Sequence, residues 1–264
     1  MNKKLLQTTF LEKYKNLHRG LGFISAELKD LLFPKFCLGC QKEGTYLCDD
    51  CRSLLDISEF NYCLCSTKPL RLFADNQGKC QRCKDKKLSG LYSALPYKEK
   101  ALTKKLIYQF KYKPFLKDLA KTLANVVAEH LLISGNNKNQ IWENGILVPV
   151  PLDKKKLKSR GYNQSEELAK ELSLILKIPV VSDVLIKTKT TPSQAELKKE
   201  EREKNLLGAF AIKQAEDGLP LFLGKKIFLV DDVYTTGSTM EECAKTLKES
   251  GAKSVWGIAI AREG

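Results

Sequence analysis

The stretch KIFLVDDVYTTGST, from Lys226 to Thr239, decides the fold of this 264-residue chain. Its apolar run, Ile227 to Val230, has the length and composition of a buried strand. Two adjacent carboxylates, Asp231 and Asp232, follow at the end of that strand, where charge is costly without a partner. A turn rich in hydroxyl groups comes next. The pattern predicts a strand that presents two acidic side chains to a ligand.

The turn after the carboxylates predicts a site for an anion. We expect a helix to begin near Ser238, because the free N–H groups and the dipole of a first helical turn favour a negative ligand. Thr235, Thr236, Ser238 and Thr239 add hydroxyl donors, and Gly237 lets the backbone approach closely. No P-loop lysine stands at the usual spacing, which disfavours a nucleoside triphosphatase. A sugar phosphate, with hydroxyls beside its phosphate, fits both the acids and the turn.

Strand and helix patterns alternate around this stretch. We expect strands in GILVPVPL (145–152), IPVVSDVLIK (178–187) and SVWGIAIA (254–261). We expect helices in residues 102–132, interrupted at Pro114, and in 163–177, where Asn163 is the expected N-cap. This alternation predicts an α/β fold with a parallel sheet and helices on both faces. Such sheets bind ligands at the carboxyl ends of their strands, where Asp231 and Asp232 stand.

Eight of the nine cysteines lie between Cys37 and Cys83, in the motifs CLGC, CDDC, CLC and CQRC. Two such pairs can complete a tetrahedral zinc site with four thiolates, which leaves no open position for catalysis and indicates a structural role. A disulfide framework is disfavoured without a secretion signal, and an iron–sulfur cluster is a weaker alternative. The ninth cysteine, Cys243, falls on one helical face with Met240, Ala244 and Leu247 and is expected to be buried there.

Sequential pairing of the motifs predicts two metal sites. The first would use Cys37, Cys40, Cys48 and Cys51, and the second would use Cys63, Cys65, Cys80 and Cys83. The first prediction is stronger, because CLC is one residue short of the usual knuckle spacing. Interleaved pairing and a single occupied site are the alternatives. Metal binding is expected to supply much of the folding free energy of this short stretch.

The charge and hydropathy of the chain limit the classes of function. The net charge of +14 favours polyanionic partners such as phosphorylated metabolites, nucleic acid or an anionic surface. No apolar run approaches the roughly 20 residues of a membrane helix, and the N-terminus is too interrupted by charge for a signal peptide. We therefore expect a cytoplasmic protein without an integral membrane segment.

The motif IFLVDDVYTTGST resembles the phosphoribosyl diphosphate (PRPP) signature of type I phosphoribosyltransferases. That resemblance implies that Asp231 and Asp232 hold the ribose hydroxyls of PRPP and that Thr235 to Thr239 wrap its 5′-phosphate. It also implies Mg²⁺, which neutralises the diphosphate leaving group. Replacing both aspartates by asparagine is expected to weaken PRPP binding and to keep or raise thermal stability, because repulsion between adjacent carboxylates is relieved.

Three further segments extend the resemblance: VPVPLDKKKLKSRGYNQSEELA, KTTPSQAELKKEEREKNLLGAF and the cysteine-rich part. With them the chain resembles, from about Leu31 onward, the ComF family, which is linked to DNA uptake in bacterial competence. This resemblance implies a double zinc ribbon fused to a type I phosphoribosyltransferase-like domain. We expect a basic helical segment at 1–36, a zinc ribbon domain at 37–87 and a phosphoribosyltransferase-like domain at 88–264. Other DNA-uptake proteins are possible partners.

The resemblance also assigns roles around the diphosphate. Arg160 and Arg202 are the candidate contacts, whereas Lys154 to Lys156 are expected to be solvated surface charges. A flap at about 187–205 would close over the site. The expected activity is glycosyl transfer of the phosphoribosyltransferase type, and the sequence points to no general base and no acceptor pocket. A role of the PRPP site in binding or regulation alone is the alternative.

A second hypothesis belongs to another class, a protein that binds single-stranded DNA. Residues 96–115 interleave five aromatic residues with many lysines, which is typical of surfaces that stack bases and attract phosphates. The candidate lysines are Lys104, Lys105, Lys111 and Lys113. On a helix, however, such aromatics are expected to be core residues and the lysines its solvated face.

Overall fold

The computed structural model describes residues 34–73, 78–98, 101–112, 116–189, 206–213 and 222–263. The chain divides into two compact units, Met1–Ser53 and Leu54–Gly264. The described part of the smaller unit contains the short helix α3 (Asp49–Ser53). Of the helical segment expected at 1–36, residues 1–33 lie outside the described residues. Within the described part of the chain, no helix is long and apolar enough to cross a membrane.

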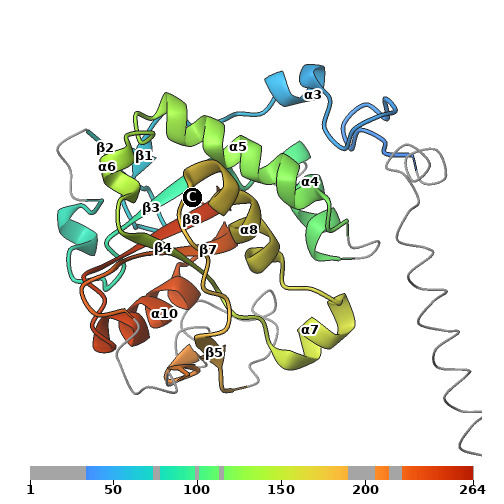
Figure 1. The fold of residues 1–264 in the computed structure, drawn as a ribbon. Helices are drawn as coiled ribbons and strands as arrows, with labels where there is room; N and C mark the ends of the chain where they lie inside the picture. The colour runs from blue at the N-terminus through green and yellow to red at the C-terminus, as the bar shows by residue number, and fades with distance from the viewer. Residues whose placement is uncertain are drawn as a thin grey trace, which may run out of the picture. The chain divides into compact units, whose positions relative to one another are not determined.

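The larger unit is built on a parallel sheet of four strands, confirming the expected fold class (Figure 1). The strand order is β3 (Gly90–Pro96), β8 (Ser254–Arg262), β7 (Lys226–Tyr234) and β4 (Gly145–Pro149). The central strands β7 and β8 are almost continuously apolar, as expected for strands covered on both faces. The position of β7 places its two carboxylates near the middle of the sheet.

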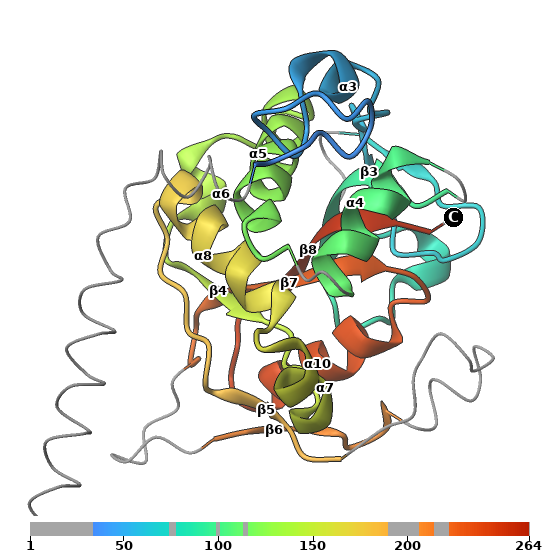
Figure 2. The same ribbon diagram turned by 90° about the vertical axis from the view of Figure 1, so that its right-hand side faces the viewer.

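Helices cover both faces of this sheet (Figure 2). On one face lie α4 (Leu102–Lys111), α5 (Leu119–Ile133) and α8 (Gln164–Leu176), and on the other lies α10 (Ser238–Glu249). The end of α4 and the start of α5 confirm the expected interruption around Pro114. Two short helices, α6 (Asn139–Trp142) and α7 (Lys154–Arg160), flank β4 in the chain.

The segment 178–187 differs from the expectation that it adds a full strand to the sheet. Around Val180 it makes only an isolated parallel bridge to Leu147 of β4, and its neighbour Pro179 has no N–H to donate. Its end forms β5 (Leu185–Lys187), which pairs antiparallel with β6 (Phe210–Ile212) in a separate sheet of two strands. This small sheet packs beside α10.

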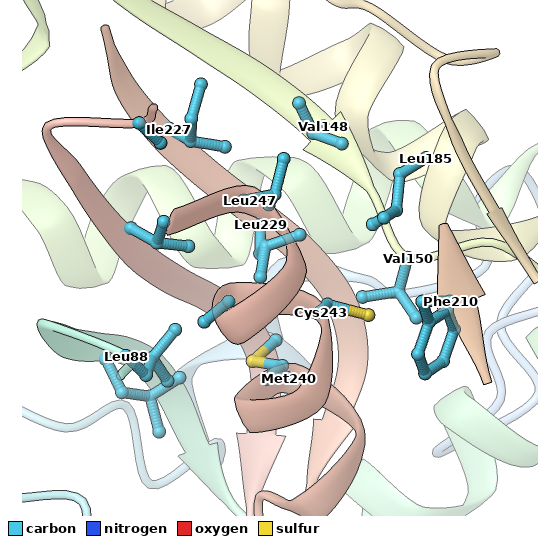
Figure 3. Close-up of a cluster of buried hydrophobic side chains, with 14 of the residues drawn as sticks. Leu88, Val148, Val150, Leu185, Phe210, Ile227, Leu229, Met240, Cys243 and Leu247 are labelled. Carbon is cyan, nitrogen blue, oxygen red and sulfur yellow. The ribbon is translucent and has the colours of Figure 1, made fainter. Parts of the chain in front are cut away.

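The core on the α10 face joins residues that are far apart in the sequence (Figure 3). Met240, Cys243 and Leu247 of α10 pack toward Leu229 of β7, which confirms the buried face expected for that helix. The same core contains residues of the cysteine-rich stretch that belongs to the larger unit: Cys63, Leu64 and Cys83. That stretch has little regular structure: β1 (Asn61–Tyr62), β2 (Arg71–Leu72) and the 3-10 turn η2 (Gln81–Cys83).

Candidate functional site

The two carboxylates lie close to the carboxyl end of β7, which continues to Tyr234, and line a cavity of about 360 Å³. The side chain of Asp231 is half-buried, whereas Asp232 is only 3% exposed. The cavity is bounded by the end of β4, the start of α8, the last turns of α4 and the 235–239 loop. This is the carboxyl edge of the parallel sheet, where open α/β folds bind their ligands.

Asp231 is held by polar contacts that fix its orientation. The hydroxyl of Ser165, at the start of α8, donates to Oδ1 of Asp231 over 3.0 Å, and the backbone N–H of Asp232 donates to the same oxygen over 2.9 Å. Burial, with the adjacent charge of Asp232, raises the pKa of Asp231 to about 7. In the protein without ligand, the side chain of Asp231 therefore gains or loses its proton near neutral pH.

Asp232 forms an ion pair with Lys111, at the end of α4. The two charged groups are 2.7 Å apart and largely removed from solvent. Burial opposes the charge of Lys111, but the attraction of Asp232 outweighs it and raises the pKa of this lysine. The second oxygen of Asp232, Oδ2, is buried and has no hydrogen-bond partner among the described residues. A buried carboxylate oxygen of this kind can accept a further hydrogen bond, for example from a ligand hydroxyl or a water molecule.

The segment RGYNQS (160–165) builds the wall beside the carboxylates. Tyr162 donates its hydroxyl to the backbone carbonyl of Phe110, and Asn163 donates to the carbonyl of Val150 at the end of β4. The side chain of Asn163 also accepts the N–H of Ser165, which confirms it as the N-cap of α8. These bonds tie α4, β4 and α8 together at the point where Ser165 reaches Asp231.

The 235–239 loop lies directly beside the carboxylates. Gly237 has a φ of 80° and is the N-cap residue of α10, which begins at Ser238 as expected. Thr236 and Ser238 share a hydrogen bond between their hydroxyls over 2.8 Å. A Cβ at Gly237 would clash with the ring of Tyr234, so only glycine fits there. All five residues of the loop line the cavity.

Besides Lys111, three cationic side chains line the cavity: Lys156, Arg160 and Lys187. Arg160 bonds to the side-chain oxygen of Gln164 and lies over the ring of Tyr112, 5.8 Å from its centroid. Burial, with the nearby charge of Lys156, lowers the pKa of Lys187. Lys154 and Lys155 are exposed, as expected, whereas Lys156 faces the cavity.

Two sequence predictions fall partly or wholly outside the described residues. Arg202, the other candidate contact for a diphosphate, lies outside them, and so does most of the flap expected at 187–205. From that flap the structure describes residues 187–189, and the side chain of Lys187 lines the cavity.

Tyrosines from α4 and from the end of β3 complete the rim of the cavity. Tyr97, Tyr108 and Tyr112 all line it, and the rings of Tyr108 and Tyr112 lie 4.8 Å apart. Tyr108 is 54% exposed and Tyr112 is 45% exposed, whereas Phe110 is fully buried. The expectation that the aromatic residues of this segment are core residues therefore holds for Phe110 and is wrong for the two tyrosines.

The eight clustered cysteines gather into two groups of four, in the sequential pairing. We call Cys37, Cys40, Cys48 and Cys51 the first cluster, and Cys63, Cys65, Cys80 and Cys83 the second cluster. In each cluster the four sulfur atoms lie within 4.8 Å of one another. Four sulfurs bound tetrahedrally at about 2.3 Å from zinc would be somewhat less than 4 Å apart, so both clusters fit this metal with little movement.

The sequence patterns do not identify Lys111, Ser165 and Lys187 as site residues, although all three line the cavity. Lys187 and Ser165 carry no distinctive pattern. The sequence pattern predicts a basic surface for Lys111, although its position four residues after the buried Ile107 aligns it with the apolar face of α4. That alignment could have indicated a lysine directed toward the sheet.

The comparisons with known proteins agree with this geometry. Residues 158–263 match the family model described as phosphoribosyl transferase domain, and residues 28–84 match the double zinc ribbon domain. The second match supports structural zinc in the two clusters.

Relatives are found over most of the chain. Competence protein F of Haemophilus influenzae is 31% identical over 229 residues, which cover 85% of this chain and 90% of that protein. Competence protein ComFC of Streptococcus pneumoniae is 28% identical over 239 residues, which cover 89% of this chain and 96% of that protein. DNA utilization protein YhgH of Escherichia coli is 38% identical over 41% of this chain and 45% of that protein. The chain therefore belongs to the competence protein F family, with a phosphoribosyltransferase domain and a double zinc ribbon.

Proposed function

We propose that this protein binds PRPP in the cavity at the end of β7 and transfers its phosphoribosyl group, in a role connected with DNA uptake. Asp231 and Asp232 accept the ribose hydroxyls, and the 235–239 loop receives the 5′-phosphate. The proposal places the protein in the cytoplasm, where thiols stay reduced and both cysteine clusters can hold structural Zn²⁺. The names of the relatives support the link to DNA, which for this chain remains part of the proposal.

The observation that carries the proposal is the buried, unpartnered oxygen of Asp232. Its carboxylate is 3% exposed, one oxygen is paired with Lys111, and the other lacks a donor among the described residues. The cavity beside it contains a helix start with hydroxyl donors. The ribose hydroxyls of PRPP can donate to the unpartnered oxygen of Asp232, while its 5′-phosphate occupies the anion site of the loop.

The three further cations of the cavity suit the diphosphate. Lys156, Arg160 and Lys187 line the cavity and would neutralise charge that grows as the bond from C1 to the diphosphate breaks. Arg202 is proposed as a further contact. Bound Mg²⁺ would add to this neutralisation, held by oxygens of PRPP near Asp231 and Asp232. PRPP binding without turnover, as a regulatory signal, is the alternative outcome.

The test is a calorimetric titration with three ligands, each with and without Mg²⁺. PRPP should bind most tightly, ribose 5-phosphate should keep part of the affinity, and inorganic diphosphate alone should bind weakly. Replacing Thr236 and Ser238 by alanine should weaken the binding of PRPP and of ribose 5-phosphate alike, because both ligands carry the 5′-phosphate. Equal affinities of the variant and the wild type for both would contradict the assignment of the loop.

A second candidate function is single-strand DNA binding at the rim of the same cavity. It is favoured by the exposure of Tyr108 and Tyr112, whose neighbouring rings could stack on bases beside Lys104 and Lys105. Lys111 is unsuitable for testing this surface, because its pairing with Asp232 makes it part of the PRPP site.

The second candidate is tested by replacing Tyr108 and Tyr112 with alanine, and separately Lys104 and Lys105. The tyrosine variant should weaken binding of an oligothymidine by roughly tenfold or more, since stacking contributes about 1–3 kcal/mol per base. The lysine variant should flatten the salt dependence. If both variants bind the oligothymidine as the wild type does and PRPP binding stays intact, these residues do not form a surface for single-stranded DNA.

A further inference from the structure

We propose that the second cluster, with its metal, clamps the 235–239 loop at both ends, so that the order of this loop and its affinity for PRPP depend on that cluster. The inference rests on the proposed function for its ligand. The clamp itself rests on hydrogen bonds that connect the cysteine-rich segment to the residues immediately before and after the loop.

The first connection is made by Tyr234, which directly precedes the loop. Its hydroxyl donates over 2.9 Å to the backbone carbonyl of Leu64, the residue between Cys63 and Cys65. Tyr234 is 2% exposed, and its ring lies against Gly237, where any side chain would collide with it. The position of the ring therefore determines where the middle of the loop can lie.

A half-buried lysine and a buried arginine strengthen this connection. Lys86 donates to the carbonyl of Leu64 over 2.9 Å and to the hydroxyl of Tyr234 over 3.2 Å. Arg262, on β8, donates to the carbonyls of Cys63 and Cys65 over 3.1 and 2.8 Å, and its guanidinium lies 5.7 Å from the centroid of the Tyr234 ring. The backbone at 63–65 is thus tied to β8 through Arg262 and to β7 through Tyr234, the residue just before the loop.

The second connection is made by Glu241, in the first turn of α10 after the loop. Its carboxylate accepts the backbone N–H groups of Lys87 and Leu88, the latter over 3.1 Å. Both residues follow shortly after Cys83, the last ligand of the second cluster. Leu88 is 1% exposed and lies in the same core as Met240 of α10 (Figure 3).

Metal binding explains how these two connections act together. The first connection involves the segment 63–65, and the second involves the residues that directly follow the segment 80–83. Both segments supply ligands to the same cluster. Four thiolates without a cation repel one another, whereas a bound metal fixes the two segments against each other. The loop is then ordered before PRPP arrives, and a preorganised site loses less entropy on binding.

The test uses the full chain and three variants. Cys65→Ser removes a ligand from the second cluster, Tyr234→Phe removes only the hydroxyl that reaches Leu64, and Cys40→Ser is the matched control in the first cluster. Zinc content, amide hydrogen exchange of residues 235–241 without ligand, and PRPP affinity are measured for each.

Cys65→Ser and Tyr234→Phe should speed exchange in 235–241 and weaken PRPP binding, by about threefold to tenfold for Tyr234→Phe, which keeps its zinc. Cys40→Ser should lose zinc and leave both measurements unchanged. Unchanged exchange in Tyr234→Phe, or an equal effect of Cys40→Ser and Cys65→Ser, overturns the clamp. Should Cys65→Ser fail to fold, Tyr234→Phe decides. Should the wild type not bind PRPP, the proposed function fails, and the exchange data still decide whether the loop is clamped.

Discussion

The two cysteine clusters have the same ligands and similar geometry but different surroundings. The first cluster belongs to the smaller compact unit, whose described part contains only the short helix α3. The second cluster belongs to the larger unit, and two of its cysteines are part of the core that covers the α10 face of the sheet. The family model spans both clusters, and the second shares buried residues with the core of the phosphoribosyltransferase domain.

This difference shows that similar metal sites can serve different parts of a protein. In the first cluster, metal would stabilise a short segment with little core of its own. In the second cluster, metal would also support Arg262 and Tyr234, which lie beside the proposed PRPP site. Variants in each cluster should therefore affect different properties.

The largest expected effect is on folding after loss of a metal site. We expect two Zn²⁺ per chain, one in each cluster, and one after either cluster is disrupted. Replacing Cys63 and Cys83 by serine should abolish or broaden the main unfolding transition, because structural zinc contributes about 10–16 kcal/mol of apparent binding free energy. Replacing Cys37 and Cys51 should leave that transition in place. Calorimetry measures the unfolding transition, and elemental analysis measures the zinc content. An equal loss of the transition in the two variants would contradict the distinction between the clusters.

An intermediate effect is expected at Arg262, which is 6% exposed and donates to two carbonyls of the second cluster. Arg262→Met should lower the free energy of unfolding by about 2–4 kcal/mol, because it leaves buried acceptors without their charged donor. Arg82 is the matched control: it also lies beside this cluster and donates to the carbonyl of Lys68, but it is exposed. Arg82→Met should cost about 0.5 kcal/mol or less in urea unfolding. A similar loss in both variants would mean that burial of the arginine is unimportant.

An effect of opposite sign is expected at Asp231, which lies three residues before Tyr234 in β7. Its pKa is about 7 in the folded protein and about 3.9 when unfolded, so its folded form favours the proton. Its contribution to stability is therefore fully present below about pH 4 and is lost as the pH rises toward 7 and above. Relative to the wild type, Asp231→Asn should therefore gain stability progressively as the pH rises from 4 to 8. A difference independent of pH in urea unfolding would contradict this assignment.

Asp232→Asn is the matched comparison and should destabilise the protein, because Lys111 would keep its charge without its partner. This replaces the simpler expectation that removing both carboxylates only relieves repulsion. The ion pair with Lys111 offsets that relief.

Much of this structure follows from local sequence patterns. The strand and helix around Asp231 and Asp232, the buried face of α10, and the grouping of cysteines 37–51 and 63–83 were all predictable, because strand periodicity and knuckle spacing are local. Contacts across the fold were not. Lys111 reaches Asp232 over 121 residues, and Tyr234 reaches Leu64 over 170. The strand predicted for 178–187 was wrong for a related reason. Its end pairs with β6, which is distant in the sequence, and no local pattern identifies that partner.

The central claim is that Asp231 and Asp232 hold the ribose hydroxyls of PRPP. The most direct measurement is a titration of PRPP, in the presence of Mg²⁺, into the double variant Asp231→Asn/Asp232→Asn, with circular dichroism to verify its fold. Charge-assisted hydrogen bonds contribute about 1.5–3 kcal/mol each, so the account predicts that affinity falls by a factor of about ten or much more. A folded double variant that binds PRPP as tightly as the wild type would contradict it.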